Sequence, residues 1–203
     1  MSKRPRFTLA DCEFEARISG GIALYDATAI MPRREEKRRK RDPSKVTHLF
    51  IHHSGALGRP GVDGAWASAN YMVNTRKRKN GKRLHAPGPA YTFWAPYEDL
   101  YDDKDRLVVL RLNPDSERSY HTGGIGNVIG DALCLQGNTS TRPLSHSHEE
   151  ILEGFIPWWT ARKKAVMPEC LSMHSESKPF GGSGKRACPG KNAEAWLNGY
   201  RRG

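Results

Sequence analysis

Hydrophobic and polar positions follow two different periods along residues 46–203, and these periods predict strands and helices in alternation. Short apolar runs, rich in β-branched and aromatic residues and bounded by polar or turn-forming residues, predict four strands. These runs are VTHLFIH at 46–52, AYTFWAP at 90–96, RLVVLRL at 106–112 and DALCLQG at 131–137. Pro96 must end the second strand, because proline has no N–H to donate to a sheet.

Three further segments carry apolar residues at helical spacing. GVDGAWASANYMVNTRKRK at 61–79 and SHEEILEGFIPWWTARKK at 147–164 predict two helices, and a third is expected after Pro189. A Ser-x-x-Glu pattern from Ser147 predicts the start of the second helix, and Pro157 is expected to kink or interrupt it. Strands that alternate with helices predict an α/β fold, a single domain with a central mixed β-sheet flanked by helices.

The first 45 residues differ in character from the rest of the chain. EARISGGIALYDATAI at 15–30 alternates around a Ser-Gly-Gly turn and predicts a hairpin that packs onto the main sheet. The basic run PRREEKRRKRDPSK at 32–45 is interpreted as a solvated, flexible link, with a polyanion-docking arm as the alternative. We therefore expect an N-terminal extension with a basic linker at 1–45 and the main domain at 46–203.

Length and charge narrow the class of protein. The chain has 203 residues, enough for one hydrophobic core of ordinary size. No apolar run is long enough to cross a bilayer, and the N-terminus lacks the apolar core of a signal peptide, so we expect no transmembrane segment and a cytosolic origin. The net charge of +11 suits either nucleic acid or the anionic bacterial envelope. Because no nucleic-acid-binding signature is present, a specific nucleic-acid partner is not expected.

The four cysteines include no CxxC pair, and a chain without an export signal is expected to keep its thiols reduced. Cys12, Cys134 and Cys170 are interpreted as small buried or half-buried residues. Cys188 is different, because its neighbours make a thiolate chemically useful.

The loop HSESKPFGGSGKRACPG at 174–190 has the residues of half a catalytic metal site, with His174 and Cys188 on one loop. A zinc hydrolase uses three protein ligands and keeps one position open for water, whose pKa falls toward neutrality. His52 is the strongest candidate for the third ligand, because it closes the strand VTHLFIH. His53 should point to the opposite strand face and is interpreted as structural, although an error of one residue between the two stays open.

Four blocks, in this order, resemble the zinc-dependent N-acetylmuramoyl-L-alanine amidases of the phage-lysozyme and peptidoglycan-recognition-protein superfamily. The blocks are LFIHHSGA at 49–56, PAYTFWA at 89–95, SYHTGGIGNVIGDALCLQGN at 119–138 and HSESK…KRACPG at 174–190. They span roughly the last three quarters of the chain. Each block alone is weak evidence, and the ordered set is specific.

The resemblance implies one Zn²⁺ per chain, bound by His52, His174 and Cys188 at the strand ends in a surface groove. It also implies that Tyr91 is a catalytic tyrosine, with ordinary strand packing as the alternative. A recycling amidase would carry a glutamate where this chain has Cys134, so the chain looks closer to the phage-lysozyme branch.

Three further residues are assigned roles by the resemblance or by their position. The family places a cation two residues before the ligand cysteine, commonly a lysine and here Arg186, and either Arg186 or Lys185 would stabilise negative charge on the substrate oxygen. The alternative is that this pair only keeps the loop soluble. His121 matches a histidine that lines the substrate groove in relatives, with a plain surface position as the alternative.

Two polar residues complete the predicted site. Asn127 is a candidate donor to the substrate. Glu176 lies two residues after His174 and is expected to accept a hydrogen bond that orients a zinc ligand.

The resemblance implies hydrolysis of the amide bond between N-acetylmuramic acid and L-alanine in peptidoglycan. We expect a monomeric phage or prophage endolysin, made in the cytoplasm of the infected host, that acts on the anionic cell wall and lyses the cell. A cytosolic muropeptide-recycling amidase and a non-catalytic peptidoglycan-binding module stay open as alternatives. A basic protein with a structural zinc would need a fourth ligand, and none stands out.

Overall fold

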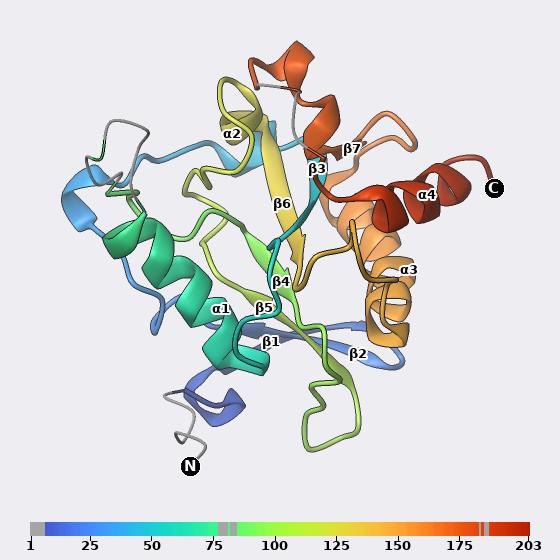
Figure 1. Ribbon diagram of the computed structural model, residues 1–203, viewed down its shortest axis with the longest axis horizontal. Coiled ribbons are helices and arrows are strands. Elements are labelled where there is room, and N and C mark those ends of the chain that lie inside the picture. The colour runs from blue at the N-terminus through green and yellow to red at the C-terminus, as the bar shows by residue number, and fades with distance from the viewer. Residues whose placement is uncertain (1–6, 77–80, 82–84, 183, 185–186) are drawn as a thin grey trace.

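A seven-stranded mixed sheet forms the centre of the molecule, as the alternating pattern predicts (Figure 1). The computed structural model describes residues 7–76, 81, 85–182, 184 and 187–203. The strands are β1 (Glu13–Ser19), β2 (Ile22–Asp26), β3 (His48–His53), β4 (Phe93–Ala95), β5 (Leu107–Arg111), β6 (Gly130–Leu135) and β7 (Leu171–Met173). Their order is β1-β2-β5-β4-β6-β3-β7. The pairs β1–β2 and β4–β5 are antiparallel, and the other neighbours are parallel.

Helices cover both faces of the sheet (Figure 1). The α-helices are α1 (Gly61–Asn70), α2 (Gly126–Ile129), α3 (His146–Lys163) and α4 (Lys191–Tyr200), and a π turn, η4 (Tyr71–Thr75), continues α1. Short 3₁₀ turns are η1 (Leu9–Asp11), η2 (Glu35–Lys37), η3 (Pro43–Lys45), η5 (His174–Glu176) and η6 (Lys178–Phe180). Helices α3 and α4 pack on one face and α1 on the other. Every helix of the described residues is too short or too polar to span a membrane.

The alternation of β3 divides its side chains between the two faces. Leu49 and Ile51 belong to the large apolar core under α3, where Phe155 meets the ring of Phe93 with centroids 4.9 Å apart. His52 is paired with Cys134, which packs in the smaller core under α1. The strand therefore sends its apolar positions toward α3 and leaves His52 on the α1 face.

The structure differs from the predicted elements at several places. Strand β7 was not predicted, because three residues are too few to show a period. Helix α3 runs through Pro157 without interruption, since Pro157 and the carbonyl it leaves unpaired, that of Glu153, both lie on the exposed side of the helix. The predicted capping residue is wrong: Ser145 caps α3 and accepts from the N–H of His148.

The N-terminal segment is part of the fold. The β1–β2 hairpin is confirmed, and β2 continues the sheet by parallel pairing with β5. The basic run was predicted to be solvated, and this is wrong for two of its arginines: Arg33 is largely buried beside Glu117, and Arg41 is fully buried in an ion pair with Asp131. The boundary at residues 45 and 46 stays a prediction.

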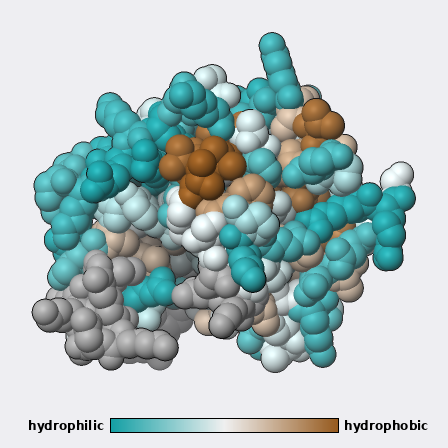
Figure 2. Space-filling model, turned by 90° about the horizontal axis from the view of Figure 1, so that it is seen from above, coloured by the Kyte–Doolittle hydropathy of each residue, from teal (hydrophilic) through white to brown (hydrophobic). Residues whose placement is uncertain are grey.

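Seen from above, the surface is mostly hydrophilic, with a few small apolar patches (Figure 2). This is the surface expected of a chain with 27% charged residues.

Candidate metal centre

Parallel pairing of β3 with β7 brings the first two candidate ligands together. Ile51 is opposite Met173 in the sheet, so His52 and His174 are the next residues along two adjacent, parallel strands. Their rings lie with centroids 4.6 Å apart. The two histidines are 122 positions apart in the sequence, and the strand register alone makes them neighbours.

Cys188 reaches the same place because its loop folds back on η5. The backbone N–H of Ser175 donates to the carbonyl of Cys188 at 2.9 Å, which ties the two ends of the loop together. The thiol Sγ lies 3.7 Å from Nδ1 of His52 and accepts from the backbone N–H of His53 at 3.4 Å. The thiol is thus fixed from both sides.

His52, His174 and Cys188 form a compact set of donors. One donor atom from each lies within 4.8 Å of the others, and the residues are 1%, 6% and 8% exposed. Two imidazoles and one thiol are ligands that Zn²⁺ favours, and three protein ligands leave a fourth position open. The geometry selects His52 from the histidine pair, since the ring of the half-buried His53 points away to Thr139, with Nδ1 3.1 Å from Oγ1.

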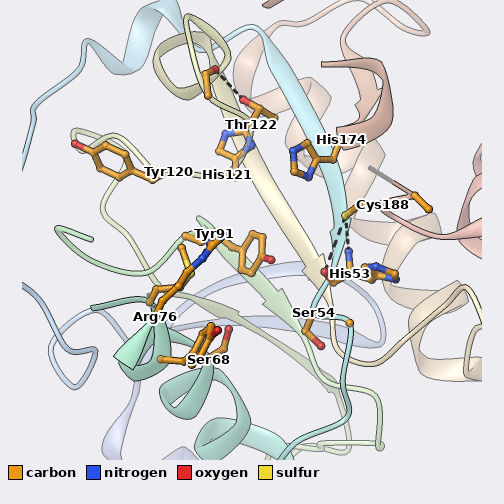
Figure 3. Close-up of a pocket in the computed structure, with 16 residues that line it drawn as sticks. His53, Ser54, Ser68, Arg76, Tyr91, Tyr120, His121, Thr122, His174 and Cys188 are labelled. Atoms are coloured by element: carbon orange, nitrogen blue, oxygen red, sulfur yellow. Dashed lines mark hydrogen bonds between the residues drawn. The ribbon is translucent and has the colours of Figure 1, made fainter. Parts of the chain in front are cut away.

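The candidate centre opens into a groove of about 540 Å³. Tyr91, Arg76 and Ser68 lie on the wall opposite His174 and Cys188 (Figure 3). The ring of Tyr91 is 5.3 Å from that of His52, centroid to centroid. Burial of its hydroxyl, together with the nearby Cys134 and Cys188, raises the pKa of Tyr91 well above its ordinary value. The hydroxyl therefore stays protonated at neutral pH and can donate a hydrogen bond into the groove.

His121 lines the groove and also touches a candidate ligand. Its Nδ1 lies 3.1 Å from Nε2 of His52, and its Nε2 lies 3.3 Å from the carbonyl oxygen of Gly130. Burial lowers the pKa of His121 to about 3, against a smaller opposing effect of the Gly130 carbonyl. The residue is buried, so the alternative of a plain surface histidine is wrong.

Asn127 holds the loop that carries His121. Its side-chain oxygen accepts the backbone N–H groups of His121, Thr122 and Gly123 at 3.0 to 3.1 Å. The side-chain oxygen of Asn127 therefore points into the loop and not into the groove. Substrate binding by Asn127 stays a prediction, and the described contacts are those of a residue that fixes backbone.

Two loops of the site meet backbone to backbone. Gly124, with a φ of +52°, lies so close to the next loop that a Cβ at this position would be 2.5 Å from the carbonyl oxygen of Phe180 and 2.8 Å from Cα of Gly181. Only glycine fits such an approach. The loop of His121 and the loop of His174 and Cys188 are held together in this way.

Glu176 acts on the candidate ligand through the chain. Its carboxylate accepts the backbone N–H of Met173 at 2.8 Å and binds both terminal nitrogens of Arg201, at 2.7 and 2.9 Å. These contacts lower the pKa of Glu176 in spite of its partial burial. They fix the turn η5, which begins at His174, so any orienting effect on the ligand goes through the backbone.

The predicted cations Lys185 and Arg186 lie outside the described residues. Sequence reasoning did not find Arg76, Tyr71 or Tyr120, which line the groove. No pattern marks them: Arg76 stands at the start of a basic cluster that reads as the end of a helix. Of the other cysteines, Cys134 and Cys170 are buried and Cys12 is half-buried, as predicted.

Comparison with known proteins shows similarity of fold. No protein-family model matches the chain. No curated protein matches it either. Solved structures do match: Drosophila peptidoglycan recognition protein LB is 14% identical with a TM-score of 0.62, over 88% of this chain and 94% of that one.

Two phage or bacterial enzymes match in the same way. The endolysin of the Thermus scotoductus bacteriophage Ph2119 is 14% identical with a TM-score of 0.58, over 87% of this chain and 97% of that one. The endolysin N-acetylmuramoyl-L-alanine amidase LysCS from Clostridium intestinale is 14% identical with a TM-score of 0.51, over 78% and 86%. The chain therefore has the α/β fold that peptidoglycan recognition proteins share with endolysins of the N-acetylmuramoyl-L-alanine amidase type.

Proposed function

We propose that this chain is a zinc-dependent amidase that hydrolyses the bond between the lactyl group of N-acetylmuramic acid and the L-alanine of the peptidoglycan stem peptide. The observation that carries the proposal is the set of His52, His174 and Cys188, buried at the floor of a groove in a fold that N-acetylmuramoyl-L-alanine amidases share. A non-catalytic binding module of the same fold would have no need for three convergent zinc donors.

The donor set fits a single zinc ion. His52, His174 and Cys188 would hold it, and the groove gives the open side on which a substrate amide can enter. A zinc ion bound by three such ligands polarises a carbonyl and makes a water molecule acidic near neutral pH.

Residues of the groove contribute the remaining chemistry. Tyr91, whose hydroxyl is protonated at neutral pH, donates a hydrogen bond to the substrate carbonyl oxygen as negative charge develops there. We assign the supporting cation to Arg186 or Lys185, in the loop just before Cys188. Arg76 adds positive charge on the opposite wall, which suits a substrate with carboxylates.

The biological setting we propose is lysis by a phage or prophage endolysin. The phage endolysin among the similar structures and the net charge of +11, which suits an anionic wall, both support it. A muropeptide-recycling amidase is the alternative setting. Parallel digestion of intact sacculi and of soluble anhydromuropeptides distinguishes the two, because an endolysin prefers the sacculi.

Metal-dependent digestion of sacculi tests the reaction itself. Purified protein is stripped with a chelator, returned to zinc or left without it, and incubated with sacculi while new L-alanine amino termini are counted. We expect release with zinc only, and none from a folded His174→Ala variant. Release by the stripped protein, or by the His174→Ala variant, at the rate of the zinc-loaded parent protein would contradict the proposal. Binding to sacculi without any release would favour a recognition module.

A further inference from the structure

A row of polar contacts lies behind His52, on the side away from Cys188. The carbonyl oxygen of Gly130, the two ring nitrogens of His121 and Nε2 of His52 follow one another at 3.3 and 3.1 Å. The remaining nitrogen of His52, Nδ1, lies 3.7 Å from the thiol of Cys188. His121 thus stands between a fixed backbone group and a candidate metal ligand.

The direction of these hydrogen bonds follows from the carbonyl. A carbonyl oxygen only accepts, so Nε2 of His121 carries the proton that faces Gly130. The ring of His121 is buried, and the guanidinium of Arg41 donates to the same carbonyl oxygen, so a second positive charge beside it is disfavoured and Nδ1 of His121 is the acceptor. Nε2 of His52 must then donate to it. Nδ1 of His52 is left with its lone pair facing Cys188, which is the form that a metal ion requires.

The start of the row is held in place from two sides. The carbonyl of Gly130 also accepts from Nη1 of Arg41 at 2.6 Å, and the same guanidinium pairs with Asp131. Nε1 of Trp159 donates to the other oxygen of Asp131 at 2.9 Å. Gly130 itself is confined, since a Cβ there would lie 2.6 Å from both the ring of Phe50 and the carbonyl oxygen of Gly126. Arg41 therefore connects the N-terminal segment to the candidate metal centre, through the carbonyl of Gly130 and the ring of His121.

We propose that His121 is a positioning residue of the candidate metal centre, which fixes the tautomer of His52 so that Nδ1 carries no proton and turns its lone pair toward the metal site, and that Arg41 anchors the Gly130 carbonyl on which this arrangement depends. Orientation of ligand imidazoles by a hydrogen bond to their other nitrogen is a general feature of metal sites. The proposal rests on the metal site of the proposed function and is independent of peptidoglycan hydrolysis. It gives the basic run 32–45 a role inside the protein.

Zinc affinity tests the proposal without any substrate. The metal-free protein, the variants His121→Leu and His121→Gln, and the control His148→Leu compete for zinc with a chromogenic chelator at pH 7. His121→Leu removes the acceptor and should weaken zinc binding about 10- to 100-fold. His121→Gln can still accept from His52 and donate to Gly130, so it should bind zinc within about 3-fold of the parent protein.

The control isolates the effect of losing a buried histidine. His148 is buried and its Nε2 lies 3.3 Å from the carbonyl oxygen of Ala95, but it belongs to α3 on the other face of the sheet. Its replacement by leucine should leave zinc affinity unchanged. Equal zinc affinity of His121→Leu and the parent protein, both folded, would overturn the proposal.

The protonated nitrogen of His52 gives a second, metal-free readout. Two-dimensional NMR of the ¹⁵N-labelled histidine rings in the metal-free protein should show the proton of His52 on Nε2, and a mixture of tautomers in His121→Leu. A proton on Nδ1 of His52 in the parent protein would overturn the proposal. If His121→Leu does not fold, the parent spectrum and His121→Gln still decide. A chain with this tautomer that leaves sacculi intact would contradict the proposed function alone.

Discussion

The same strands place apolar core residues on one face of the sheet and candidate site residues on the other. Under α3 the strands contribute Leu49, Ile51 and Phe93 to an apolar core that also contains Phe155 and Trp159. Under α1 and the adjoining loops, the next residues along the same strands include His52, which meets His121, a residue that lines the groove. The difference shows how a strand can be anchored by one set of side chains while it presents the other set for chemistry.

A comparison of two buried histidines, His121 near the groove and His148 on α3, makes the contrast specific. His121 and His148 each lie 3.3 Å from a backbone carbonyl, and burial lowers the pKa of each, to about 3 and about 4. The second nitrogen of His148 has no hydrogen-bond partner among the described residues. The second nitrogen of His121 meets His52. Burial keeps both rings neutral, and only the neighbour of the second nitrogen links one of them to the candidate metal centre.

The largest effect expected on the α1 face is that of removing a ligand thiol. Cys188→Ala should lower the rate of L-alanine release by about 1,000-fold or more, because several kcal/mol of transition-state stabilisation depend on the metal. The matched control is Cys170→Ala, which removes a buried thiol from the α3 face and should keep the parent rate. Similar rates of L-alanine release in the two variants would show that the thiol near the groove matters no more than the thiol in the α3 core.

The largest effect expected on the α3 face is one of stability. Phe155→Ala empties a fully buried aromatic site and should lower the free energy of unfolding by about 3 to 5 kcal/mol, measured by urea denaturation. Zinc affinity of the folded variant should be unchanged. Phe14→Ala, at a side chain that is 52% exposed, should cost less than about 1 kcal/mol. A loss of zinc affinity in Phe155→Ala would show that the faces are coupled.

Removal of one hydroxyl from the groove should have a smaller effect on rate. Tyr91→Phe should reduce the rate of hydrolysis by about 100-fold, the usual result of deleting a donor to a developing oxyanion, and leave zinc affinity unchanged. Tyr25→Phe serves as the control, because that hydroxyl binds Asp102 at 3.2 Å, away from the groove. If Tyr91→Phe hydrolyses the substrate at the parent rate, the hydroxyl of Tyr91 has no catalytic role and the ring serves only in packing.

The smallest effect concerns pH and the α3 face. The unfolded chain protonates His148 near its ordinary pKa of 6.5, whereas the folded chain does so only near 4, so the unfolded state binds more protons between these values. The free energy of unfolding of metal-free protein should fall as pH drops from 6.5 to 4, by about 1 kcal/mol per pH unit from this residue. His148→Gln should reduce that slope in urea titrations, and an unchanged slope would exclude His148 as its source.

Most of the strands that carry the candidate site could be predicted from the sequence. The proximity of the candidate ligands to one another could not. The four predicted strands are present, and His52 stands at the end of β3 as its pattern indicates. The proximity of His174 depends on β7, whose three residues become a strand only by pairing with β3. A period cannot be read from three residues, so resemblance to a family was needed to join the two.

The prediction that the basic run is solvated was wrong for a similar reason: a partner distant in the sequence decides the outcome. A dense row of arginines and lysines predicts solvation, since most such side chains stay in water. Arg41 is buried because Asp131, 90 positions later in the sequence, neutralises it. The inward turn of Asn127, at the start of α2, was also missed, although an asparagine shortly after a Gly-Gly pair can supply an acceptor for the backbone N–H groups before it.

The close approach of Gly124 to Phe180 and Gly181 also constrains how the gene can vary. Every single-base change of a glycine codon that substitutes another amino acid adds a Cβ, and at this position a Cβ would push apart the loops that carry His121 and His174. A glycine with no reactive side chain is therefore as sensitive to point mutation as the candidate metal ligands. In a library of random mutants selected for the proposed wall lysis, codon 124 should keep glycine as strictly as the codons of His52, His174 and Cys188 keep their residues.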